Sequence, residues 1–149
     1  MANGKKQLTE EEQIEKQEEQ DDVLKALLSA EDRPEKDVYM KRFGVNFRIR
    51  AIDGDTISKI QERCTHYQGK GRKKEKILDE EKFGALIIKE ACINPDWNNK
   101  QLLEKYKVPE AAEVIRKRLL AGEIAKLADE ILELSGFDAE DEEEGKVKN

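Results

Sequence analysis

The sequence predicts an α+β fold that is predominantly α-helical, with four to six helices and one β-hairpin or short antiparallel sheet. Charged residues make up 42% of the 149 residues and aromatic residues only 5%, so we expect a small, aliphatic, helix-dominated core. Apolar residues recur at helical spacing along most of the chain, whereas residues 43–51 alternate between apolar and polar, as in a half-buried strand.

At 149 residues the chain is long enough for one domain with its own core, and a second full domain is not expected. We expect an acidic, partly frayed N-terminal helix over residues 1–30 and a single mainly helical domain over residues 37–137, with a hairpin at 38–52. Six of the seven residues from 138 to 144 are acidic, so we expect residues 138–149 to form a disordered acidic tail.

Charge is segregated along the chain, although the net charge is only −6. Residues 1–37 carry 6 positive and 12 negative side chains, whereas residues 38–76 carry 11 positive and 4 negative ones. This distribution favours self-screening or a polar interaction surface over nucleic-acid binding. There is no apolar run near 18 residues, no signal-peptide pattern and no disulfide pattern in Cys64 and Cys92. We therefore expect a soluble, intracellular protein without a membrane partner, in a reducing compartment.

The N-terminal helix is predicted from about Glu10 to Ser29. Thr9 followed by Glu12 is a capping-box arrangement, which favours a helix start at this point. The first half is rich in Glu and Gln, whereas the apolar residues gather at the end, so we expect the first half to fray without a partner. Pro34 disfavours helix in the residue before it and marks a linker.

A β-hairpin is predicted next, because the hydrophobic period changes after residue 37. Five apolar residues alternate with polar ones and predict a strand with one buried face: Phe43, Val45, Phe47, Ile49 and Ala51. Residues 38–40 are expected to form a short preceding strand, with a turn near Phe43 and Gly44. Asp53 then offers a cap to a helix whose apolar positions are Ile57, Ile60, Cys64 and Tyr67.

Residues 68–76 have two glycines, five cations and no apolar residue, and therefore predict a mobile loop. A helix is expected to open at Asp79 and to stop at Asn94-Pro95. A short helix capped by Asn98 or Asn99 follows, with the single tryptophan in the turn before it.

The apolar pattern from Val108 to Phe137 predicts two helices, or one kinked helix, ending near Ser135-Gly136. Five apolar residues step by four, three, four and three along one face: Leu120, Ile124, Leu127, Ile131 and Leu134. Pro109 suits the first turn of a helix, and Gly122 is either a helix-ending residue or a tolerated weak point. Such a stripe must be covered, either by the chain's own core or by a partner.

Few residues have the spacing that catalysis or metal binding requires. Cys64 and His66 are two apart and would point in different directions on a helix, so a buried thiol beside an exposed histidine is the expected arrangement. Cys64, His66 and Cys92 lack the paired spacings of a zinc site. The segment 53–55 resembles the start of a calcium loop but has no closing glutamate, and a turn is expected. We predict a protein that is not an enzyme and that holds no metal and no cofactor.

The basic segment 70–76 leaves open an alternative function, a small regulatory or nucleic-acid-associated module. Its order and position do not match a Walker phosphate loop. Cations on a mobile loop can release counterions from phosphate, but no interleaved aromatic residues offer stacking. A solvated loop is therefore the expected interpretation, and nucleic acid is not an expected partner.

The order of segments resembles one known family. The relevant stretches are Arg42–Ile52 (RFGVNFRIRAI), Ile87–Trp97 (IIKEACINPDW), Leu119–Ile124 (LLAGEI) and Leu134–Phe137 (LSGF). In this order, after a Glu/Gln-rich helix, they resemble the XkdN-like tail assembly chaperones of phages and defective prophages of the PBSX type. The resemblance covers roughly residues 8–137 and consists of apolar and turn patterns, with no catalytic motif.

The resemblance implies a non-enzymatic helper that coats the long helical tape-measure protein, keeps it soluble and helps recruit tail-tube subunits. It also implies action in the cytoplasm of the bacterial host and absence from the mature virion. An apolar groove between helices would serve this role, with possible self-association of the chaperone. The hypothesis is that five residues contribute to a partner surface, the alternative being ordinary core: Ile124, Leu127, Ile131, Leu134 and Phe137.

Overall fold

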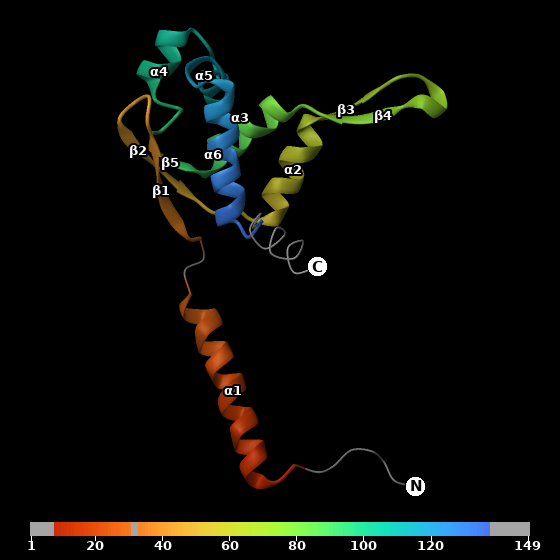
Figure 1. Cartoon of the computed structure of the whole chain (residues 1–149), viewed down its shortest axis with the longest axis vertical. Helices are drawn as coiled ribbons and strands as arrows, with labels where there is room; N and C mark the ends of the chain where they lie inside the picture. The colour runs from red at the N-terminus through yellow and green to blue at the C-terminus, as the bar shows by residue number, and fades with distance from the viewer. Residues whose placement is uncertain (1–7, 31–32, 138–149) are drawn as a thin grey trace. The chain divides into compact units, whose positions relative to one another are not determined.

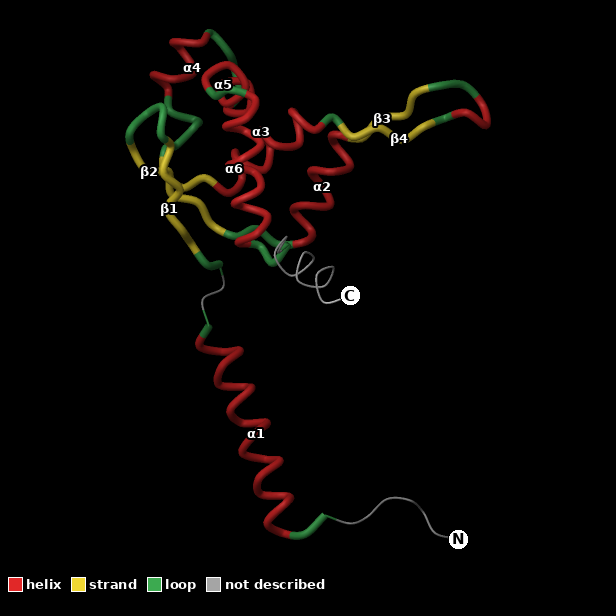
Figure 2. The backbone as a smooth tube through the Cα atoms, viewed as in Figure 1, coloured by secondary structure: helices red, strands yellow, loops and turns green. Residues whose placement is uncertain are grey.

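The computed structural model describes residues 8–30 and 33–137 (Figures 1 and 2). In these ranges it contains six α-helices, one 3₁₀ helix and five short strands, which confirms the predicted α+β, predominantly helical fold. Contacts divide the chain into two compact units, residues 1–32 and 33–149. The predicted disordered tail, residues 138–149, lies outside the described residues.

Helix α1 (Glu10–Ser29) is the only element of the first unit within the described residues. The hydroxyl of Thr9 accepts the backbone N–H of Glu12 at 3.2 Å, and the Glu12 carboxylate accepts that of Thr9 at 3.3 Å. This is the predicted capping box, formed by local hydrogen bonds. No residue of α1 is buried. The expected fraying of its first half stays a prediction.

Strands β1 (Glu35–Met40) and β2 (Val45–Arg50) form the predicted hairpin, paired from Glu35↔Arg50 to Met40↔Val45. Gly44, at φ +67°, closes the turn, and its N–H donates to the carbonyl of Met40 at 2.9 Å.

The alternation predicted the buried face of the hairpin only in part. Phe47, Ile49 and Ala51 are buried as expected, but Phe43 is half-buried and Val45 is 51% exposed. Val45 lies at the turn end of the hairpin, outside the core that covers the middle of β2.

A third strand, β5 (Cys92–Asn94), was not predicted. It pairs antiparallel with β2 through Ile49↔Cys92 and Arg48↔Asn94, which gives the sheet order β1-β2-β5. The strand begins where helix α3 ends, so this helix stops three residues before the predicted Asn94-Pro95. A strand of three residues is too short to show a period of two, and only its pairing with β2 defines it.

Helix α3 (Glu80–Ala91) lies at the centre of the second unit and contacts α2 (Gly54–Cys64), α5 (Ala111–Arg118) and α6 (Ala121–Leu134). Its residues 84–88 are all buried, and Asp79 caps its first turn as predicted, accepting the N–H of Lys82 at 3.1 Å. A helix that is apolar over so much of its surface must be surrounded. The short helix α4 (Lys100–Tyr106) is capped by Asn99, one of the two predicted candidates.

The predicted mobile loop at residues 68–76 is instead part of a second β-hairpin. Strand β3 (Thr65–Gln68) pairs with β4 (Glu75–Leu78) around a 3₁₀ turn, η1 (Gly71–Lys73). The helix predicted to extend through Tyr67 therefore ends at Cys64. Gly69 makes the turn possible, because its φ is +96° and a β-carbon there would lie 2.5 Å from the carbonyl oxygen of Lys73.

The C-terminal stretch forms two helices, one of the two predicted arrangements, but the break lies at Leu119-Leu120. Gly122 is the second residue of α6, so it does not end a helix, and Pro109 precedes α5 without belonging to its first turn. The end near Ser135-Gly136 is confirmed. The Ser135 hydroxyl accepts the N–H of Ile52 at 2.9 Å, which ties the end of α6 to the chain leaving β2.

Candidate partner-binding groove

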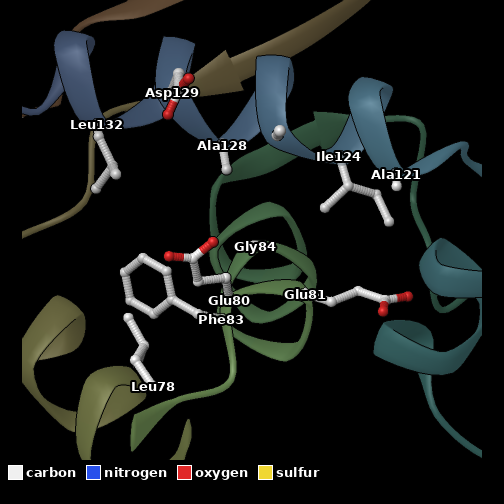
Figure 3. A pocket seen from close by; sticks show the side chains of 11 residues that line it. Leu78, Glu80, Glu81, Phe83, Gly84, Ala121, Ile124, Ala128, Asp129 and Leu132 are labelled. Atoms are coloured by element: carbon white, nitrogen blue, oxygen red, sulfur yellow. The ribbon is translucent and has the colours of Figure 1, made fainter.

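A groove with a volume of about 570 Å³ lies between α3 and α6 (Figure 3). Most of the lining comes from these two helices, and strand β4 adds one residue. The lining residues are Leu78, Glu80, Glu81, Phe83, Gly84, Ala121, Ile124, Ala125, Ala128, Asp129 and Leu132.

Small side chains form the middle of the groove, and larger ones flank it. The two helices come closest at Gly84, where an added β-carbon would lie 2.8 Å from Cγ2 of Ile124 and 3.8 Å from Cβ of Ala128. Phe83 of α3 and Leu132 of α6 lie on the same side of this contact, as half-buried apolar walls on the two facing helices (Figure 3). The two helices are therefore in close contact at Gly84, and their outer edges line the open groove.

The rim of the groove is acidic. Glu80, Glu81 and Asp129 are exposed at its edge, and none of the lining residues, all in the described part of the chain, is basic. Arg116 approaches Glu81 with an Nε–Oε1 distance of 3.5 Å and balances part of this charge. A channel with an apolar floor and a negative rim fits an apolar segment flanked by Lys or Arg.

The structure does not bring the five predicted partner residues together on the surface. Ile124, Leu127 and Ile131 are buried in the core of the second unit, at 3%, 0% and 0% exposure. Leu134 is half-buried and Phe137 is 57% exposed. Of the five, only Ile124 lines the groove.

Two residues that form the groove walls, Phe83 and Leu132, were not among the predicted partner residues. Leu132 falls off the apolar stripe, immediately after Ile131, and Phe83 precedes the buried run of α3. For Leu132, its position off the apolar stripe of α6 was the available sequence signal, and Phe83 had no comparable one.

The cysteines do not have the environment of a catalytic thiol. Cys64, the last residue of α2, is buried, whereas His66 is exposed on β3. Burial raises the pKa of the Cys64 thiol and raises the pKa of the Cys92 thiol to about 11. A nucleophilic cysteine requires the opposite shift of the pKa.

The candidate ion site at residues 53–55 is a helix cap, as expected: Asp53 accepts the N–H of Thr56 at 2.8 Å. Within residues 8–30 and 33–137, no three His, Cys, Asp or Glu side chains are grouped so that they could hold a metal ion. None of the helices described is both long and apolar enough to cross a bilayer.

Residues 24–148 match the family of phage XkdN-like tail assembly chaperone proteins, and the chain belongs to this family. Two relatives come from Bacillus subtilis strain 168. The phage-like element PBSX protein XkdN is 36% identical over 107 residues, which cover 68% of this chain and 72% of XkdN. The uncharacterised protein YqbN is 36% identical over 96 residues, which cover 63% of this chain and 64% of YqbN. A crystal structure of YqbN superposes with a TM-score of 0.55 at 29% identity, over 73% of this chain and 90% of that chain.

Proposed function

We propose that this protein binds and solubilises the tape-measure protein of a phage or prophage tail and helps recruit tail-tube subunits, without catalysing a reaction. It acts in the cytoplasm of the bacterial host and is absent from the mature virion. Membership of the tail assembly chaperone family supports a role in tail morphogenesis. The observation that carries the proposed mode of binding is the acidic-rimmed apolar groove between α3 and α6.

The groove has the properties that a helical client requires. A long amphipathic helix exposes an apolar face that aggregates until it is covered. The apolar walls Phe83 and Leu132 would contact that face, and the carboxylates of Glu80 and Asp129 would attract cations beside it. The groove is open rather than enclosed by a lid, so a bound helix can be released when the tail tube assembles around it.

The proposal is tested by co-expressing the protein with a fragment of the tape-measure protein and measuring how much of the fragment stays in solution. In the variant Ala125→Trp the groove is filled from an exposed position, and we expect the soluble fraction of the client to fall at least several-fold. Glu133→Trp is the matched control, because it places the same side chain on α6 at an exposed position that does not line the groove.

The two possible failures are distinct. If the wild-type protein leaves the fragment insoluble, the proposed function is wrong. If the wild type and Ala125→Trp protect the fragment equally, the function stands, but the client binds elsewhere.

A further inference from the structure

Two elements of the structure expose most of their side chains. Helix α1 has no buried residue, and its apolar end is open to solvent, with Leu27 at 73% and Leu28 at 77% exposure. The β3–β4 hairpin projects away from α2 and α3 (Figure 1), and every residue from 66 to 76 is exposed. A two-stranded hairpin is marginally stable alone in water, so a bound partner would stabilise it.

The two elements carry opposite charges. Residues 10–22 of α1 contain eight carboxylates and a single cation, Lys16. The hairpin, residues 65–78, contains five cations and a single carboxylate, Glu75. None of the five hairpin cations forms an ion pair within the described part of the chain. Each element also presents exposed apolar atoms, Leu27 and Leu28 on α1 and Tyr67 on the hairpin.

Charge also argues against two other occupants for α1. Pairing of α1 with α1 of another molecule in parallel would set eight carboxylates against eight, which is destabilising. The α3–α6 groove has its own acidic rim of Glu80, Glu81 and Asp129, which would repel the acidic half of the helix.

We propose that α1 of one molecule docks along the β3–β4 hairpin of a second copy of this chain. The surfaces that meet are different on the two molecules, so the contact is heterologous and can repeat from copy to copy. A second copy is the occupant we propose because every copy carries both surfaces, and the two are complementary in charge.

The association should be electrostatic in origin and therefore sensitive to salt. Single exposed ion pairs contribute little, but a row of carboxylates facing a row of cations acts as a network, reinforced by burial of Leu27 and Leu28. Raising the ionic strength from about 0.05 M to about 0.5 M shortens the Debye length roughly threefold, and we expect the association constant to fall about tenfold or more.

The experiment uses the full chain and measures self-association by analytical ultracentrifugation over a range of concentrations. The triple variant R72E/K73E/K74E and the quintuple variant E11K/E15K/E18K/E19K/D22K, which reverses the net charge of residues 10–22, should each weaken association at least tenfold. An equimolar mixture of the two should associate again, because the reversed charges are complementary. All eight side chains are exposed, so both variants should keep the wild-type circular dichroism spectrum.

The matched control for R72E/K73E/K74E is K100E/K105E/K117E. It makes the same change in net charge as the hairpin variant, at exposed positions away from the hairpin. It should associate like the wild type. Equal weakening by the control, or no rescue in the mixture, would overturn the proposal.

Other outcomes also decide against this proposal. A chain that stays monomeric at all concentrations overturns the proposal. If the chain is monomeric and R72E/K73E/K74E changes hydrogen exchange in α1, the helix lies on the hairpin of its own molecule. A salt-dependent shift of DNA or RNA mobility that is lost in R72E/K73E/K74E, with no self-association, would assign the hairpin to nucleic acid. Solubilisation of the tape-measure fragment is measured separately, so failure here leaves the proposed function standing.

Discussion

Gly84 of α3 and Ile124 of α6 approach so closely that a β-carbon added to Gly84 would lie 2.8 Å from Cγ2 of Ile124. Both residues are buried. In a helix the β-branched isoleucine has one strongly preferred rotamer, so its methyl group cannot simply rotate away. This contact therefore sets the separation of the two helices whose outer edges form the groove.

We predict that Gly84→Ala destabilises the protein. Overpacking a core contact costs about 1–3 kcal/mol. Replacing a helical glycine by alanine returns about 1 kcal/mol of helix propensity, so the net loss should reach up to about 2 kcal/mol. The free energy of unfolding, measured by urea denaturation, checks this prediction.

Gly122→Ala provides the matched control. Gly122 is also helical, but it is exposed, and an added β-carbon would meet nothing within 4 Å. Only the propensity gain remains, so this variant should be more stable than the wild type by about 0.5–1 kcal/mol. If both alanine variants stabilise the protein equally, the close approach at Gly84 does not limit the packing of α3 on α6.

The second prediction separates core from surface along the C-terminal stripe. Leu127 is fully buried, so Leu127→Ala should lower the free energy of unfolding by about 2–5 kcal/mol. Phe137 is 57% exposed, and Phe137→Ala should change it by less than about 0.5 kcal/mol. Thermal and urea unfolding measure both. A stable Leu127→Ala protein that loses its client would favour the partner-surface hypothesis for this residue.

The third prediction concerns stability in acid. Arg42 donates two hydrogen bonds to Glu123 Oε1, at 3.1 Å from Nε and 2.7 Å from Nη2. These bonds, with the backbone N–H of Leu120, hold the pKa of the Glu123 carboxyl below its ordinary value of 4.5, although partial burial opposes the shift. A lowered pKa in the folded state stabilises the protein above the ordinary value, and this contribution is lost as the pH falls through the lowered pKa.

Glu123→Gln should therefore remove part of the pH dependence of stability in acid. The variant should be less stable than the wild type near neutral pH, and the difference should shrink as the pH falls below about 4. Urea unfolding at several pH values measures this difference. A difference between the two proteins that stays constant from neutral pH into acid would contradict the assigned role of the Arg42–Glu123 pair.

The fourth prediction concerns the thiols. Because burial raises the pKa of Cys64 and raises that of Cys92 to about 11, both should react slowly with a thiol reagent at neutral pH and rapidly after denaturation.

The raised pKa of Cys92 also predicts a loss of stability as the pH rises from about 9 to about 11, since the thiol ionises first in the unfolded state. Cys92→Ser should lose this alkaline dependence. Fast labelling of native Cys64 that is abolished by His66→Ala would instead indicate a catalytic site formed by Cys64 and His66.

Several elements were predictable because their causes are local. Thr9, Asp53 and Asp79 each cap a helix by accepting an N–H three residues later, so residue type and spacing were sufficient. The β1–β2 hairpin was also predictable, since its strands are neighbours joined by a turn with Gly44. Both kinds of element depend on interactions within a few residues.

The errors in the prediction share a different cause. Strand β5 exists only because Cys92 and Asn94 pair with β2, more than 40 residues earlier in the chain. The cation-rich sequence of the second hairpin predicts a loop, whereas the pairing of Thr65 with Leu78 makes it a sheet. Short strands carry little periodicity, and their partners define them.

The amino-acid sequence by itself determined the family, the helix-dominated fold and the existence of an apolar stripe that something must cover. Only the tertiary structure decided what covers it: α6 turns Leu127 and Ile131 into the core. The structure also placed Phe83 and Leu132 as walls of an open groove. The physical reason is that a periodic pattern specifies which face of a helix is apolar. The close approach of α3 and α6 at Gly84 specifies which part of that face stays accessible.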